Sequence, residues 1–234
     1  MMNTSKNETP DTGKPSSQNR YISAEQLIAK MKIAFSNAKQ PEILSQLATV
    51  GITEPMLDGY LNEITNLELL SQKQIQEYGE QYAQTEGFNL KRAEIENTYR
   101  RHRNLAKIAM NGDRQAHTTL GTDEKVKRAY PAWYQQVSNF YAQILANPTF
   151  KAKAATVNID DAAIAAQQAA LEEISALKES QKKELGEAQK ATEVRDTALD
   201  LLYPKYTRLV SFAKVLFPDD QTLEKLGIKV KSVE

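Results

Sequence analysis

The sequence predicts an all-α protein: an elongated helical bundle built from two tandem repeats of about 105 residues each. Three observations lead to this prediction. Apolar residues recur at spacings of three and four, no segment alternates apolar and polar residues as a half-buried strand does, and one phrase occurs twice. That phrase is Ala-Thr-Val-x-Ile, which begins at Ala48 and again at Ala155.

The repeat appears when the chain is compared with itself at an offset of 107 residues, the distance between the two phrases. Over residues 41–113 and 148–220, 17 of 73 aligned pairs are identical, whereas chance gives roughly 6%. Both copies also end alike, with LGTDEKVK over 120–127 and LGIKVK over 226–231. We therefore predict a disordered polar tail over residues 1–20, one helical repeat over 21–127 and a second over 128–234, the two packed as one structural unit.

Each repeat is expected to open with a helix that has one apolar face. The residues of this face are Leu27, Met31, Ala34 and Phe35 in the first copy, and Trp133, Val137, Phe140, Tyr141 and Ile144 in the second. A shorter helix follows Pro41 and Pro148. We expect it to end at Gly51 in one copy and at Asn158 in the other, because glycine and asparagine best tolerate the left-handed conformation that closes a helix.

Long helices are predicted near 54–110 and 160–217, with Thr53 and Asp160 as their N-caps. Their apolar residues have heptad-like spacing, as in a coiled coil. These residues are Leu57, Leu61, Ile64, Ile75, Tyr78 and Tyr82 in the first helix, and Leu199, Leu202, Tyr206, Leu209, Ala213 and Leu216 in the second. Pro204 is expected to kink the second helix. The alternative is a turn near 86–90 and 203–204, which would give shorter antiparallel helices.

Composition excludes several kinds of protein. The chain contains 30 Lys and Arg residues and 30 Asp and Glu residues, so no net charge attracts it to nucleic acid or anionic lipid. It contains no cysteine, which excludes disulfides and thiolate chemistry. The N-terminal segment lacks the apolar core of a secretory signal, and no run approaches the roughly 18 apolar residues of a membrane span. We expect a soluble, cytoplasmic protein.

The two histidines are not expected to form a site. His102 lies on the apolar face at the position that Leu209 holds in the second repeat, which indicates a buried packing residue. His117 lies between the repeats and is expected to be exposed. The sequence has no HExxH, Walker or Gly-x-Ser-x-Gly pattern. We therefore predict no metal, no cofactor and no catalytic residue.

Six polar residues recur near the middle of the long helices: Gln74, Glu77, Glu80, Gln181, Glu184 and Glu187. Gly79 and Gly186 accompany them. We favour a close helix crossing at these glycines, with the polar residues setting the register between the repeats. The less favoured hypothesis is an enzyme that uses the paired glutamates for acid–base catalysis.

Six basic residues lie on the first long helix: Lys91, Arg92, Arg100, Arg101, Arg103 and Lys107. They are candidate contacts for nucleic-acid phosphates or for an acidic partner. A solvated or salt-bridged surface is the favoured interpretation. The reason is that the second repeat keeps only Lys205, Arg208 and Lys214 in the matching segment.

The second repeat contains GEAQKATEVRD over 186–196 and LEKLGIKVK over 223–231. These segments resemble a pattern found in uncharacterised bacterial all-helical proteins with an internal duplication. The first repeat resembles the pattern less closely, since Gly87 and Phe88 stand in place of Val194 and Arg195. The resemblance implies the fold and a bacterial origin, and it implies no activity.

The leading functional hypothesis is a non-catalytic structural or interaction protein, a helical scaffold that binds a protein partner or associates with itself. It follows from the long helices, the duplication and the lack of a catalytic pattern. Nucleic-acid binding through residues 91–107 is the alternative hypothesis.

Overall fold

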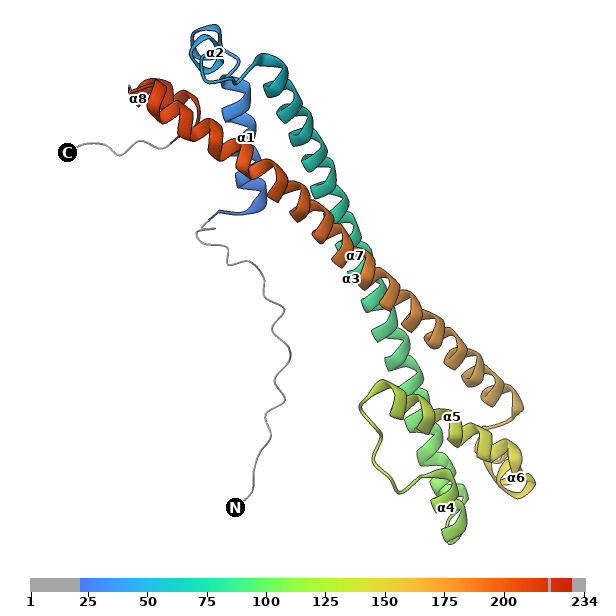
Figure 1. Cartoon of the computed structure of the whole chain (residues 1–234). Helices are drawn as coiled ribbons and strands as arrows, with labels where there is room; N and C mark the ends of the chain where they lie inside the picture. Colours follow the sequence, from blue (N-terminus) through green and yellow to red (C-terminus); the bar gives the residue numbers. More distant parts are fainter. Residues whose placement is uncertain (1–21, 219, 229–234) are drawn as a thin grey trace, which may run out of the picture. The chain divides into compact units, whose positions relative to one another are not determined.

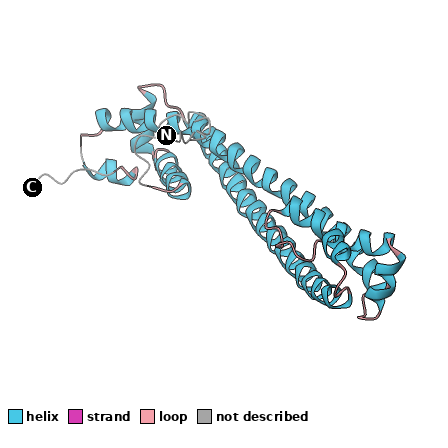
Figure 2. Cartoon of the chain, turned by 90° about the horizontal axis from the view of Figure 1, so that it is seen from below, coloured by secondary structure: helices cyan, strands magenta, loops and turns pink. Residues whose placement is uncertain are grey.

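The computed structural model describes residues 22–218 and 220–228, and every regular element among them is an α-helix (Figures 1 and 2). The all-α prediction is therefore confirmed. The helices are α1 (Ala24–Asn37), α2 (Pro41–Ala48), α3 (Glu54–Ala109), α4 (Arg114–Leu120), α5 (Tyr130–Ala146), α6 (Pro148–Ala155), α7 (Asp161–Leu216) and α8 (Asp220–Lys225). No described helix combines the length and the apolar character needed to cross a membrane. The tail predicted over residues 1–20 and the last residues of the LGIKVK segment, 229–231, lie outside the described part of the chain.

The two long helices are continuous, as the favoured interpretation predicted. Helix α3 runs without a break through Gly87, and α7 runs through Pro204. The hypothesis of turns near 86–90 and 203–204 is therefore wrong. Glycine costs a helix about 1 kcal/mol and proline about 3 kcal/mol. Burial of Phe88, which follows Gly87, and of Leu202, two residues before Pro204, contributes stability against these costs.

The short helices α2 and α6 end as the repeated phrase predicts. Gly51 has φ of 80° and Asn158 has φ of 61°, so both adopt the left-handed conformation. In each case the following amide bonds back into the short helix, as between Ile52 and Leu47 at 3.1 Å. The carboxylate of Asp160 then accepts a backbone hydrogen bond of 2.8 Å from the third residue of α7. The predicted end of α6 and the predicted N-cap of α7 are thus confirmed.

The chain divides into two compact units. In the described part of the chain, unit 1 comprises the residues up to Gln72 and those from Glu193 onward, and unit 2 comprises Lys73–Thr192. Unit 1 therefore contains α1, α2, the beginning of α3, the end of α7 and α8. Unit 2 contains the end of α3, then α4, α5 and α6, and the beginning of α7. Each unit draws on both long helices.

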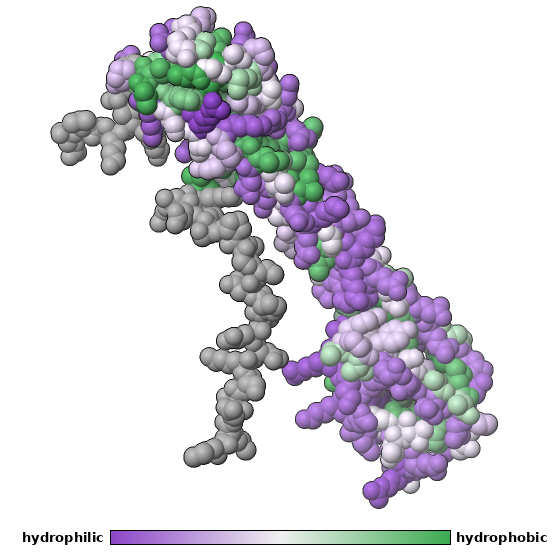
Figure 3. Space-filling model, in the orientation of Figure 1, coloured by the Kyte–Doolittle hydropathy of each residue, from purple (hydrophilic) through white to green (hydrophobic). Residues whose placement is uncertain are grey.

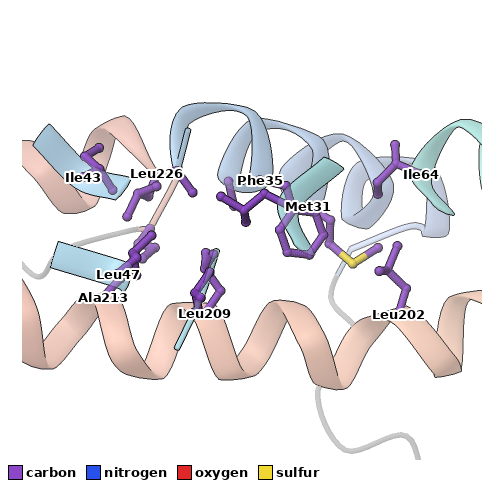
Figure 4. Packing of buried hydrophobic residues seen from close by; sticks show 14 of the residues in the cluster. Met31, Phe35, Ile43, Leu47, Ile64, Leu202, Leu209, Ala213 and Leu226 are labelled. Carbon is purple, nitrogen blue, oxygen red and sulfur yellow. The ribbon is translucent and has the colours of Figure 1, made fainter. Parts of the chain in front are cut away.

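The core of unit 1 is mostly aliphatic, and its buried aromatic residues are Phe35 and Phe217. Met31 and Phe35 of α1 lie over Leu202 and Leu209 of α7 (Figure 4). Helix α2 and the beginning of α3 add further buried side chains, including Ile64. Each such side chain stabilises the fold by about 1.5–3 kcal/mol when it is fully buried.

The core of unit 2 contains more aromatic residues. Trp133, Phe140 and Tyr141 of α5 are fully buried there, together with Ile95 and Tyr99 of α3. The rings of Tyr99 and Phe140 meet edge to face, with centroids 5.4 Å apart. Such a pair contributes about 0.5–1.5 kcal/mol beyond the burial of its surface. The expectation that the aromatic residues of α5 form a core is confirmed.

The predicted apolar seam of α3 is wrong in its middle part. Ile75 and Tyr82 are both 66% exposed. The buried and half-buried positions there are one residue earlier, at Gln74 and Gln81. They continue the spacing of three and four that begins at Leu57, so the helix keeps one packing register although its side chains become polar. The prediction used apolar residues alone and therefore placed the packing positions one residue too late, at Ile75 and Tyr82.

Candidate functional site

Polar residues from the middle of α3 and α7 meet within unit 2. Gln74 donates from Nε2 to the hydroxyl of Thr192 at 3.4 Å, and Gln181 donates in the same way to Thr85 at 3.3 Å. Both glutamines and both threonines are partly buried. The two hydrogen bonds are reciprocal, because Gln181 and Thr192 each follow their counterparts by 107 residues. The structure thus brings together both predicted glutamines.

Three of the predicted glutamates also lie together in unit 2. Glu77, Glu80 and Glu184 each place a carboxylate oxygen within 4.8 Å of the others. The side chain of Glu184 is only 14% exposed, and its Oε2 is buried without a hydrogen-bond partner. Glu187 does not join this group. It is exposed and pairs with Lys183 at 3.5 Å.

The chemistry of this carboxylate cluster is limited. Three carboxylate oxygens are the type of ligand that hard divalent cations such as Mg²⁺ and Ca²⁺ prefer. Neither His102 nor His117 belongs to the cluster. Gln76 donates to Glu80 at 2.8 Å, and Lys183 lies 3.9 Å from Glu184, so these neighbours compensate part of the negative charge.

The predicted close helix crossing at the glycines is wrong. A Cβ atom added at Gly79 or Gly186 would have no heavy atom within 4 Å. Both glycines are exposed. The printed contacts between the two helices in this region join Gln74 to Thr192 and Gln181 to Thr85, so the glycines do not form the contact.

The predicted basic residues of α3 lie in unit 2, and five of the six contact other protein groups. Lys91 pairs with Glu173 at 2.6 Å, and this hydrogen bond raises the pKa of the lysine. Arg100 pairs with Glu96 at 2.6 Å, one turn away. Arg101 is exposed, and within the described part of the chain it has no carboxylate partner.

The remaining three basic residues hold the chain that follows α4. Arg103 donates to the carbonyls of Gly121 and Thr122 at 3.2 and 2.8 Å, and also to that of Glu124. Arg92 donates to the carbonyl of Arg128, and its guanidinium lies 5.1 Å from the Trp133 ring centroid. Lys107 pairs with Asp123 at 2.6 Å.

His102 is buried, as predicted, at 4% exposure. Its Nδ1 lies 3.0 Å from the hydroxyl of Tyr141. Burial lowers the pKa of His102, and the charge of Arg101 lowers it further. His117 was expected to be exposed, and this expectation is wrong. It lies half-buried on α4, with Nδ1 2.8 Å from the hydroxyl of Thr122.

Comparison with known proteins adds nothing to this geometry. No protein-family model, curated protein or solved structure matches the chain.

A pocket that sequence reasoning missed lies beside the basic face of α3. Its volume is about 530 Å³, and its walls are Arg92, Glu96, Arg100 and Arg103 from α3 and residues 124–128 from the segment after α4. Three of its residues were predicted as contacts. Lys125, Lys127 and Arg128 were not, although the run Lys-Val-Lys-Arg over 125–128 was a visible signal.

Proposed function

We propose that the protein is a non-catalytic helical scaffold that binds a protein partner. In this proposal it is an elongated bundle of two tandem repeats, 21–127 and 128–234, and it acts in the cytoplasm of a bacterium. The duplication is supported by the bounds of the helices. Helices α6 and α7 each begin and end 107 residues after α2 and α3.

The observation that carries the proposal is an exposed surface present in both copies. On the last turns of α3 it includes Arg101, Lys107 and Ile108. The same positions of α7 hold Arg208, Lys214 and Val215. Ile108 is 71% exposed and Val215 is 80% exposed. We call these two surfaces the outer faces of α3 and α7.

Core packing does not explain why the two outer faces carry the same types of residue. Single exposed apolar side chains are normal, and Figure 3 shows several separate hydrophobic spots on a mostly hydrophilic surface. Here, however, the same combination of an arginine, a lysine and a β-branched residue occurs at matching positions that no core requires. The helix dipole favours lysine in the last turn of a helix. It does not account for Arg101 and Arg208, which lie two turns earlier.

The chemistry of the outer faces indicates the partner. No acidic residue occurs over 97–112 or over 201–218, so positive charge predominates on each face, although Asp123 pairs with Lys107 on the face of α3. The partner that fits is an acidic amphipathic helix. Its apolar side covers Ile108 or Val215, and its carboxylates approach the flanking Arg and Lys.

This proposal is favoured over nucleic-acid binding through residues 91–107. Most of the cations in that segment already contact protein groups, as with Lys91 and Glu173. Among the described residues of 97–112 and 201–218, Tyr203 is the only exposed aromatic side chain, and stacking of successive bases would require more than one.

Photo-crosslinking in the source organism tests the proposal. A benzoylphenylalanine replaces Ile108 or Val215 in the full chain. Matched controls carry it at Leu69 or Ile75, which are 59% and 66% exposed but correspond to Ala176 and Lys182 in the other repeat. Positions 108 and 215 should capture the same acidic segment, at least about tenfold more efficiently than the controls. Arg101→Glu with Arg208→Glu should reduce this capture by about fivefold or more.

Other outcomes contradict the proposal. Equal capture at all four positions would mean that the outer faces are ordinary surface. Capture of a second copy of this chain would show that the outer faces serve self-association instead of binding a different protein. Capture of nucleic acid, detected by nuclease digestion of the adduct, would favour the alternative function.

A further inference from the structure

The pocket beside α3 has a preorganised wall. The carbonyls of the segment after α4 accept hydrogen bonds from Arg92 and Arg103. Gln136 of α5 holds the same segment from its other side. It accepts from the amide of Lys127 at 3.0 Å and donates to the carbonyl of Lys125 at 3.1 Å. The backbone of the wall is thus fixed by side chains of two helices.

The pocket concentrates positive charge in a chain whose net charge is zero. Six of its lining residues are Lys or Arg, and two are Glu. Both glutamates are already paired, Glu96 with Arg100 at 2.6 Å and Glu124 with Lys127 at 3.2 Å. Lys125 and Arg128 are exposed, and no carboxylate pairs with them in the described part of the chain. Like charges held this closely repel one another, so an anion would stabilise the site.

A second observation also indicates a missing acceptor. The Nε of Arg103, one of the lining residues, is buried and has no hydrogen-bond acceptor. An unsatisfied buried donor costs about 1–3 kcal/mol. The pocket therefore combines uncompensated charge with an unused donor.

We propose that this pocket binds a small anion that carries two or more phosphoryl groups. The planar guanidinium matches phosphate oxygens in a bidentate manner, and Lys125 and Arg128 supply mobile charges at the rim. The volume of about 530 Å³ lies within the range of small-molecule sites. This site is independent of the outer faces and of the proposed protein partner.

Calorimetry with the full chain tests the inference, with sodium diphosphate as the probe at low salt. The test variant is Lys125→Ala with Arg128→Ala, because both side chains are exposed and neither supports the core. The control is Lys182→Ala with Lys190→Ala, which removes the same charge from exposed positions of the same unit. The first variant should weaken diphosphate binding at least about tenfold, whereas the control should change it less than about twofold.

Comparison of ligands tests the chemical class. Orthophosphate should bind about tenfold more weakly than diphosphate, since it carries one phosphoryl group. Citrate, a carboxylate of similar charge, should also bind more weakly, and equal binding would overturn the assignment to phosphoryl groups. The inference is also overturned if diphosphate does not bind, or if it binds equally to both double variants. If a single-stranded oligonucleotide binds more tightly through Lys125 and Arg128, the ligand of the pocket is a nucleic-acid backbone and the small-anion proposal is wrong.

Discussion

The imidazole Nδ1 of His102 lies 3.0 Å from the hydroxyl oxygen of Tyr141 in the core of unit 2. The two rings meet edge to face at a centroid distance of 5.9 Å. In unit 1 the residues at the matching positions, 107 residues away, are Leu209 and Ala34, both buried. One unit therefore contains a hydrogen-bonded polar pair where the other contains an apolar pair. This difference makes the two cores respond differently to pH and to substitution.

The stability of the protein should decrease as the pH falls below 6.5. Burial lowers the pKa of His102 from its ordinary value of 6.5, so the unfolded chain binds this proton more readily than the folded protein. The contribution of His102 is complete above pH 6.5 and is lost as the pH falls through the lower pKa of the folded state. Urea unfolding between about pH 5 and 8 measures this dependence. A double variant His102→Leu with Tyr141→Phe should show a flatter profile, and an unchanged profile would assign the effect to other groups.

The same pair should show strong energetic coupling. Tyr141→Phe leaves the buried histidine without its partner, and His102→Leu leaves the phenol hydroxyl without its own. Each change should reduce the free energy of unfolding by about 1–3 kcal/mol. The double variant should lose less than the sum, with a coupling energy of about 0.5–3 kcal/mol. Additive losses in a double-mutant cycle would show that the 3.0 Å contact contributes no stability.

Replacing glycine by alanine should stabilise the protein at exposed positions inside helices and destabilise it where the glycine is left-handed. Gly79→Ala and Gly186→Ala should each raise the free energy of unfolding by about 0.5–1 kcal/mol, because both are exposed positions inside helices. Gly51→Ala should lower it by about 1–2 kcal/mol, because φ there is 80°. None of these three positions has a neighbour within 4 Å of the added Cβ, so the backbone conformation alone decides the sign of the change in stability. Thermal unfolding measures all three variants. A large loss of stability in Gly79→Ala would instead support a close helix crossing at that glycine.

Removing one charge from the carboxylate cluster should stabilise unit 2. Glu184→Gln relieves the repulsion by Glu77 and Glu80 and removes a buried unpaired oxygen, for a gain of about 1 kcal/mol at low salt. Glu187→Gln is the control, because that exposed side chain pairs with Lys183 and should change stability by less than about 0.5 kcal/mol. Urea unfolding measures both variants. Destabilisation by Glu184→Gln, reproduced by EDTA in the unmodified protein, would instead indicate a cation held by the three carboxylates.

Much of the fold could be predicted because it depends on local chemistry. The left-handed conformation at Gly51 and Asn158 follows from residue type, and so does the cap at Asp160. His102 could be assigned to a core because Leu209 holds the matching position. Ile75 and Tyr82 could not be placed in the same way, because burial there depends on the register of the facing helix.

The sequence by itself determined the first three helices of each repeat, where the short ones end and many of the core residues, because these features follow from propensity, capping and periodicity within a few turns. The tertiary structure decided which elements share a unit. It joined the end of α7 to α1 and α2, and the end of α3 to α5 and α6. It also placed Lys125 and Arg128 beside Arg92, Arg100 and Arg103. Such neighbours are far apart in the chain, and long-range packing and hydrogen bonds to the backbone bring them together.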